Sequence, residues 1–124
     1  MKRGQPPKVG MVLAFTGHYR SARIIAAFLR RIGVDLVTSQ RTTPEILKAA
    51  SALASADFCL PLRTYVGHVH ALITQHPDLD YIVAPNIHSE DEITSTCSKY
   101  RDLGGVAVRS LADTLGYQLR FAPG

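Results

Sequence analysis

The chain has 124 residues, of which 46% are apolar and 19% charged, and its formal net charge is +4. This length supports one domain with its own core and is too short for two ordinary domains. The basic residues are scattered, and no basic stripe is interleaved with aromatic side chains, so nucleic-acid binding is not expected. The apolar run at 11–15 is too short for a signal peptide or a membrane span, and two distant cysteines argue against a disulfide framework. We therefore expect a cytoplasmic protein that does not bind membranes.

The first third of the chain alternates between strand and helix patterns. Residues 1–7 contain one glycine and two prolines and are expected to form a loose tail. Residues 9–15 form a continuous apolar run, which is typical of a strand buried on both faces of a parallel sheet. Residues 24–32 carry apolar side chains at helical spacing, and Gly33 is a natural stop for that helix. Residues 34–38 are short and rich in β-branched side chains, which predicts a second strand.

The same alternation continues to the C-terminal part. Thr43 is expected to cap a helix that starts at Pro44, because threonine suits the N-cap and proline the first helical position. A brief strand is predicted at 56–59, followed by a helix from Pro61 to about residue 76 and a buried strand at 81–84. The remaining expected elements are a last strand at 106–108 and a helical turn or two at 110–115.

Alternating strands and helices predict an α/β fold with three layers and a parallel sheet of four or five strands. A single domain would span residues 8–124. Ligands bind beyond the carboxyl ends of the strands in such sheets. The polar groups expected at this edge follow four strands: Thr16, Gly17 and His18; Ser39 to Thr42; Cys59; and Asn86, His88 and Cys97. Polar βα loops also occur in any such fold, which is the alternative explanation.

Cys59 lies two residues before Pro61, at the expected mouth of a helix. Unpaired N–H groups and the helix dipole favour negative charge there, which lowers the pKa of a thiol. A thiolate is the form that a metal or an iron–sulfur cluster needs. The alternative is a small buried hydrophobe, because free cysteine is among the most buried residue types.

The helix from Pro61 carries three further candidates. His68 and His70 point about 200° apart on a regular helix, so they cannot share one ion, and His68 is the better candidate. A histidine at the edge of the core is its alternative role. Gly67 is expected on the polar face, where alanine would be better by about 1 kcal/mol. Close approach of another backbone, a partner or a ligand would explain the glycine. Arg63 could serve an anion or simply be solvated.

The order of several segments resembles the uncharacterised domain of acyl-CoA dehydratase activase-related proteins, which are relatives of the 2-hydroxyacyl-CoA dehydratase subunits. The likeness covers roughly residues 8–105. Its most specific part is the C-x-P-x-R pattern that starts at Cys59 and is followed by Gly67-His68. The other matching segments are 9–10, 28–34, 39–47, 69–72, 80–85 and Cys97.

The resemblance implies a flavodoxin- or Rossmann-like fold and iron–sulfur chemistry. In the relatives, cysteines on flavodoxin-like lobes hold a [4Fe–4S] cluster, to which an ATP-driven activator passes one electron for radical dehydration of a 2-hydroxyacyl-CoA. Carried over to this sequence, Cys59 and Cys97 would be cluster ligands. Pro61, Gly67 and His68 would shape the pocket, and Arg63 is a further candidate at the site. The implied partner is a second copy of the chain or a dehydratase-type subunit.

The sequence departs from the family pattern at several points. Val12 and Leu13 stand where the family has Pro-Arg, and Ser98 follows Cys97 where the family has proline. The chain is also shorter than the family domain. Two cysteines cannot complete a [4Fe–4S] cluster, which wants four protein ligands or three with an open iron. The chain is then a truncated form of the domain, or two copies share a cluster, or the cluster has been lost.

A second function fits the same residues. In this alternative, the protein is a non-catalytic α/β module that binds a small anionic ligand or a protein partner at the same edge of the sheet. The cysteines are then structural.

Overall fold

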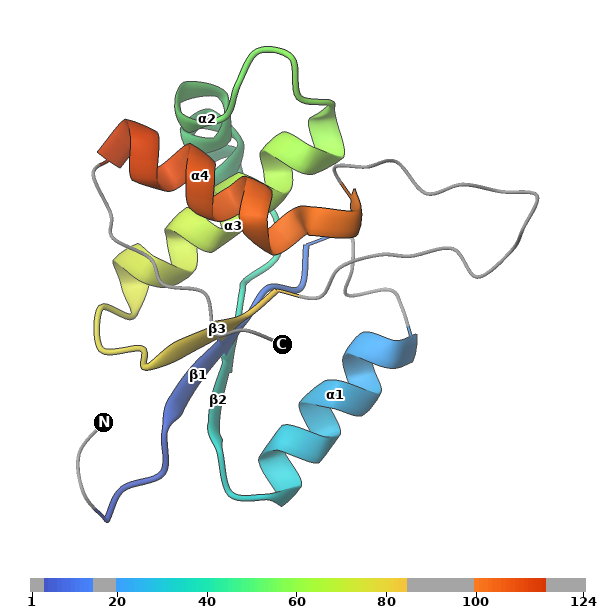
Figure 1. Cartoon of the computed structure of the whole chain (residues 1–124), viewed down its shortest axis with the longest axis vertical. Helices are drawn as coiled ribbons and strands as arrows, with labels where there is room; N and C mark the ends of the chain where they lie inside the picture. Colours follow the sequence, from blue (N-terminus) through green and yellow to red (C-terminus); the bar gives the residue numbers. More distant parts are fainter. Residues whose placement is uncertain (1–3, 15–19, 85–99, 116–124) are drawn as a thin grey trace.

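The computed structural model describes residues 4–14, 20–84 and 100–115. Three parallel strands form a sheet of order β2-β1-β3. Helix α1 lies on one side of this sheet, and α2, α3 and α4 lie on the other (Figure 1). The elements in chain order are β1 (Lys8–Met11), α1 (Arg20–Arg31), β2 (Asp35–Thr38), α2 (Pro44–Leu53), α3 (Leu60–Gln75), β3 (Tyr81–Val83), the short 3-10 helix η2 (Tyr100–Asp102) and α4 (Leu103–Leu115).

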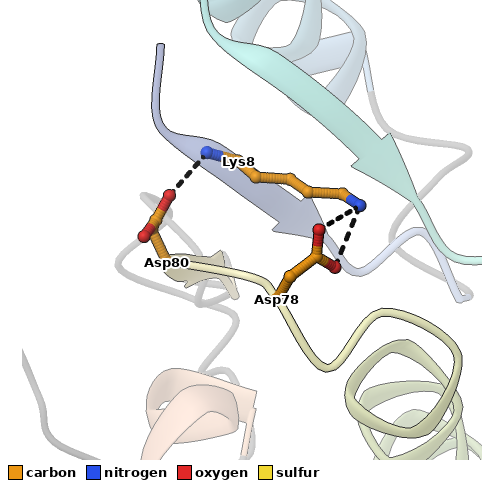
Figure 2. A network of polar contacts seen from close by, with 3 residues as sticks. All are labelled: Lys8, Asp78 and Asp80. Atoms are coloured by element: carbon orange, nitrogen blue, oxygen red, sulfur yellow. Dashed lines mark hydrogen bonds and ion pairs between the residues drawn. The ribbon is translucent and has the colours of Figure 1, made fainter. Parts of the chain in front are cut away.

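Lys8, the first residue of the central strand, ties β1 to the turn that precedes β3. Figure 2 shows its backbone N–H donating to a carboxylate oxygen of Asp80 at 2.8 Å and its ammonium group bonding both carboxylate oxygens of Asp78 at 2.9 and 3.0 Å. The hydrogen bond to Lys8 lowers the pKa of the Asp78 carboxyl group. An exposed ion pair adds little stability, so the main effect of these contacts is to align β3 with β1.

The larger part of the core lies between the sheet and the three helices on its α3 side. Helix α3 provides half of that cluster, because its apolar side chains recur at helical spacing. The buried apolar residues of the cluster are Val12, Leu62, Tyr65, Val66, Val69, Leu72, Leu103, Val106, Ala107 and Leu111. The cluster on the α1 side is smaller and consists of Met11, Ala22 and Ala26.

The start signals expected for α2 and α3 are confirmed. Thr43 is the N-cap of α2, and its hydroxyl accepts a hydrogen bond from the backbone N–H of Ile46 at 3.3 Å. Cys59 is the N-cap of α3, and Pro61 lies in its first turn. Proline is tolerated there because the first N–H groups of a helix have no partner within it.

The predicted sheet of four or five strands is wrong, since the described residues contain three. Residues 56–59 form a turn and bend instead of a strand. Arg63 takes up the carbonyl groups of Ala56 and Phe58 that a strand would offer to its neighbour. Residues 106–108 belong to α4, because Leu103, Val106, Ala107 and Leu111 have helical spacing and pack on the core.

Gly67 does not lie on a polar face, and the expectation that alanine would stabilise the helix there is wrong. It is buried against α2, where a Cβ atom would lie 2.7 Å from the carbonyl oxygen of Ile46 and 3.0 Å from the Cβ of Ala50. Close approach of another backbone is therefore the explanation that holds. The glycine lets α2 and α3 pack closely.

Among the described helices, none combines the length and the apolar character that crossing a membrane requires.

We expect Gly67→Ala to lower the free energy of unfolding by about 1–3 kcal/mol, because the added methyl group meets backbone that cannot move without displacing α2. Chemical denaturation monitored by circular dichroism measures the change. Gln75→Ala, at the exposed end of the same helix, is the matched control and should change stability by less than about 0.5 kcal/mol. Equal effects of the two substitutions would contradict the close packing of α2 and α3.

Candidate functional site

The candidate cluster ligand and pocket residues within the described part of the chain lie on α3 or directly before it. Cys59 precedes the first turn, Arg63 lies in that turn, and Gly67 and His68 lie in the middle of the helix. Cys97, the second expected ligand, falls outside the described residues. The same holds for Thr16, Gly17 and His18 after β1, and for Asn86 and His88 after β3.

Cys59 lies at the surface. Its thiol makes no capping hydrogen bond to the helix, and its carbonyl oxygen accepts from the backbone N–H of Arg63 at 3.0 Å. The alternative in which Cys59 is a small buried hydrophobe is therefore wrong. Its position at the amino end of a sixteen-residue helix favours negative charge on a bound group.

The guanidinium group of Arg63 holds the loop that carries Cys59. Its Nε donates to the carbonyl oxygen of Phe58 at 2.9 Å, and one terminal nitrogen donates to the carbonyl oxygen of Ala56 at 2.6 Å. Sequence reasoning offered an anion ligand or a solvated side chain for Arg63 and missed this role. These two hydrogen bonds of Arg63 fix the backbone on the N-terminal side of Cys59.

His68 is almost completely buried, with 1% of its surface exposed. Its Nε2 lies 2.8 Å from the hydroxyl oxygen of Thr42, in the loop between β2 and α2. Burial lowers the pKa of His68, so the imidazole is neutral at pH 7. Its Nδ1 is buried and has no hydrogen-bond partner among the described residues.

The loops at the carboxyl ends of β1 and β2 meet as the fold class predicts. The hydroxyl oxygen of Ser39 accepts from the backbone N–H of Leu13 at 2.8 Å, and the N–H of Ser39 donates to the carbonyl oxygen of Met11 at 3.0 Å. The contact between Thr42 and His68 joins α3 to this edge. Both residues were candidates from the sequence, but their pairing was not foreseen.

Tyr65 is a further polar group that the sequence pattern hid. It was counted as one of the apolar residues of the helix, and its ring is fully buried in the core. Burial raises the pKa of its phenol well above the usual range. The phenol therefore stays protonated over the whole range in which proteins are stable.

The candidate residues form two separate pairs: Cys59 and Arg63 at the amino end of α3, and Gly67 and His68 in the middle of the helix. Cys59 and His68 are nine positions apart, which corresponds to about 14 Å along a helix. Metal–ligand bonds are only about 2.0–2.3 Å long, so one ion cannot bind both side chains. Among the described residues, no three His, Cys, Asp or Glu side chains come together in a way that could hold a metal ion.

The chain matches a known protein family over most of its length. The family model described as "CoA enzyme activase uncharacterised domain (DUF2229)" matches residues 8–117. The matched range includes all the described elements and both cysteines. Neither the curated proteins nor the solved structures give a match to this chain.

We expect the stability of the protein to fall as the pH drops below about 6.5, the usual pKa of histidine. The folded state disfavours the charged form of His68, so the unfolded state binds more protons there. The stability that the neutral imidazole contributes is complete above pH 6.5 and declines toward the lowered folded-state pKa, at a slope of at most about 1.4 kcal/mol per pH unit.

Urea unfolding at pH 7.5 and 5.5 measures this decline. His68→Gln removes the titrating group and keeps a polar side chain near Thr42, so its decline should be smaller than that of the wild type. Thr42→Val removes the hydroxyl group but keeps the imidazole, and should retain the pH dependence. An equal decline in the wild type and His68→Gln would refute the assignment.

We also expect Arg63→Gln to lower the free energy of unfolding by about 1–3 kcal/mol, because two charge-assisted hydrogen bonds are lost. Hydrogen exchange of the amides at 55–59 should become faster. Arg109→Gln is the matched control: Arg109 forms an exposed ion pair with Asp102 at 2.8 Å, which is worth less than about 1 kcal/mol. Unchanged exchange at 55–59 in Arg63→Gln would argue against the structural role.

Proposed function

Because the chain belongs to the family of the CoA enzyme activase uncharacterised domain, we propose that it is an iron–sulfur-binding domain that supplies part of the ligand set of a [4Fe–4S] cluster. Cys59 and Cys97 are the proposed ligands, and Cys59 is the one within the described residues. The remaining ligands come from a second polypeptide, either another copy of this chain or a partner subunit of the CoA-enzyme system.

The observation that carries this proposal is the exposure of Cys59 at the amino end of α3. Its thiol takes no part in capping the helix. The amino end of a helix favours the negative charge of a cluster bound there. A ligand at the surface is also one that a second polypeptide can reach.

A cluster site closed within one chain does not fit the described residues. No group of three potential ligands occurs among them, and the whole sequence contains two cysteines. A [4Fe–4S] cluster takes four protein ligands, or three with an open iron. We therefore propose that two polypeptides share the cluster, which makes the oligomeric state part of its test.

When bound, such a cluster supplies one-electron transfer. The residues of this chain hold and orient its ligand. Arg63 fixes the loop before Cys59 through the carbonyl groups of Ala56 and Phe58. Gly67 fixes the position of α3 against α2. These contacts fix the position of the amino end of α3, which suits a ligand that must meet a second polypeptide in one geometry.

We expect protein purified and reconstituted without oxygen to contain about two iron and two acid-labile sulfide atoms per chain in a dimer, since two chains share four. Iron and sulfide analysis, a visible spectrum and sedimentation measure these quantities together. Cys59→Ser and Cys97→Ser should each lose the iron. The matched control is Leu60→Ser, which changes the exposed neighbour of Cys59 and should keep the iron.

A colourless, iron-free protein after reconstitution, both alone and with an added CoA-enzyme subunit, would overturn the proposal. The non-catalytic module that binds an anion or a partner would then be the better description. About four iron atoms per monomeric chain would instead show a closed site and would refute the sharing of ligands.

A further inference from the structure

Helix α1 exposes a stripe of large apolar side chains. Ile24, Phe28 and Ile32 are 63%, 60% and 59% exposed. They are spaced four residues apart, so Ile24 and Phe28 lie along one side of α1, and Ile32 continues that side in the turn that follows the helix. We call these three residues the α1 stripe. A contiguous exposed apolar surface of this kind marks an interaction site more often than scattered apolar residues do.

The sheet covers only part of the apolar surface of α1. Ala22 and Ala26 pack against Met11 of the central strand, and Ile25 is half-buried beside them. At 100° per residue, the α1 stripe extends from about a quarter of a turn (Ile32) to about half a turn (Ile24) away from the side that holds the two alanines. The apolar surface of α1 is therefore wider than the sheet can cover, and the described residues leave the side chains of its outer part mostly exposed.

The hand of the fold indicates which way the α1 stripe faces. Strand β1, α1 and β2 form a parallel βαβ unit, and nearly all such units are right-handed. In that hand, Phe28 and Ile32 lie on the flank of α1 nearer to β3. Arg23 and Arg30 lie on the opposite flank, and Arg20 and Arg31 lie outward, next to Ile24.

Strand β3 is also poorly covered on the α1 face. Val83 packs against the α1-side cluster and Ile82 against the α3-side cluster. Because side chains alternate along a strand, Tyr81 is on the α1 face, and it is 54% exposed. Within the part of the chain that the structure describes, one helix thus covers three strands on this face, whereas three helices cover the other (Figure 1). The region that these described elements leave open lies beside α1 and over β3.

We propose that this region binds an amphipathic helix of a partner protein. That helix carries carboxylates along its outward flank. The apolar side of that helix would cover the α1 stripe and Tyr81. Its carboxylates would pair with Arg20 and Arg31. The charge of α1 supports this choice of partner, because the helix contains four arginines and no acidic residue.

A second copy of the chain and a lipid surface fit less well. If α1 paired with α1 of a second copy, eight arginines would lie around the shared apolar contact, and neither helix would supply a carboxylate. The like charges of these arginines would repel one another. A negatively charged bilayer would meet the exposed Asp35, Asp78 and Asp80 at the edge of the sheet where α1 ends. An acidic helix in the open region contacts the arginines and can avoid these carboxylates.

The test uses the full chain and two designed helical peptides with the same leucine face, one with glutamates on its flanks and one with lysines. We expect the glutamate peptide to bind at least about tenfold more tightly, and its affinity to fall with salt. Phe28→Ser should weaken its binding by about tenfold or more, because a large apolar contact is lost. Fluorescence anisotropy of the labelled peptides measures both effects. The matched control is Leu47→Ser, which changes an exposed apolar residue of α2 and should bind the peptide like the wild type.

Failure of both peptides to bind, equal binding of the two, or unchanged binding in Phe28→Ser would each overturn the proposal. A dimer in sedimentation that Phe28→Ser dissociates would assign the surface to a second copy. Binding to phosphatidylserine vesicles that depends on Phe28 would assign it to a bilayer. A loss of more than about 1 kcal/mol of stability in Phe28→Ser would show that the chain covers the stripe itself. These results do not depend on iron, so they are separate from the test of the cluster.

Discussion

The close approach of α2 and α3 at Gly67 is the constraint on which the arrangement of the α3 side depends. Because this residue has no side chain, the backbone of α2 at Ile46 reaches the surface of α3 directly. Helix α3 is then enclosed by the sheet on one side and by α2 and α4 on others. That enclosure buries His68 and brings it to Thr42, just before α2 begins.

Local chemistry in the sequence was enough to predict the starts of two helices. Thr43 and Pro44 signal the N-terminus of α2 wherever the helix packs, and Cys59 with Pro61 does the same for α3. Features that depend on distant contacts were not predictable. The sequence pattern at 56–59 is that of a short strand. In the structure, the guanidinium group of Arg63 donates hydrogen bonds to the carbonyl oxygens of this segment, so they are not available for strand pairing. The β-branched side chains at 106–108 suggest a strand, but burial beside Leu103 and Leu111 favours the helix.

The candidate site was predictable in its location but not in its geometry. The rule for parallel sheets placed Thr42 at the carboxyl edge, and helical spacing placed His68 on a core-facing helix. Neither rule measures the distance between Cys59 and His68, which the rise of the helix makes too long for one shared ion. The role of Gly67 was also hidden, because a helical wheel drawn for α3 alone does not include α2. The family match agrees with the resemblance read from the sequence over nearly the same range.

The order of synthesis gives the contacts of Lys8 another meaning. Strand β1 is the first strand made and becomes the centre of the sheet, but its pairing with β3 joins residues that lie 72 positions apart. A growing chain therefore exposes one edge of β1 until residue 83 has left the ribosome. Unpaired strand edges invite pairing with other chains, and charged lysines on them oppose it. Lys8 is a residue of the kind that opposes such pairing, and in the folded domain the same residue is held by Asp78 and Asp80 next to β3.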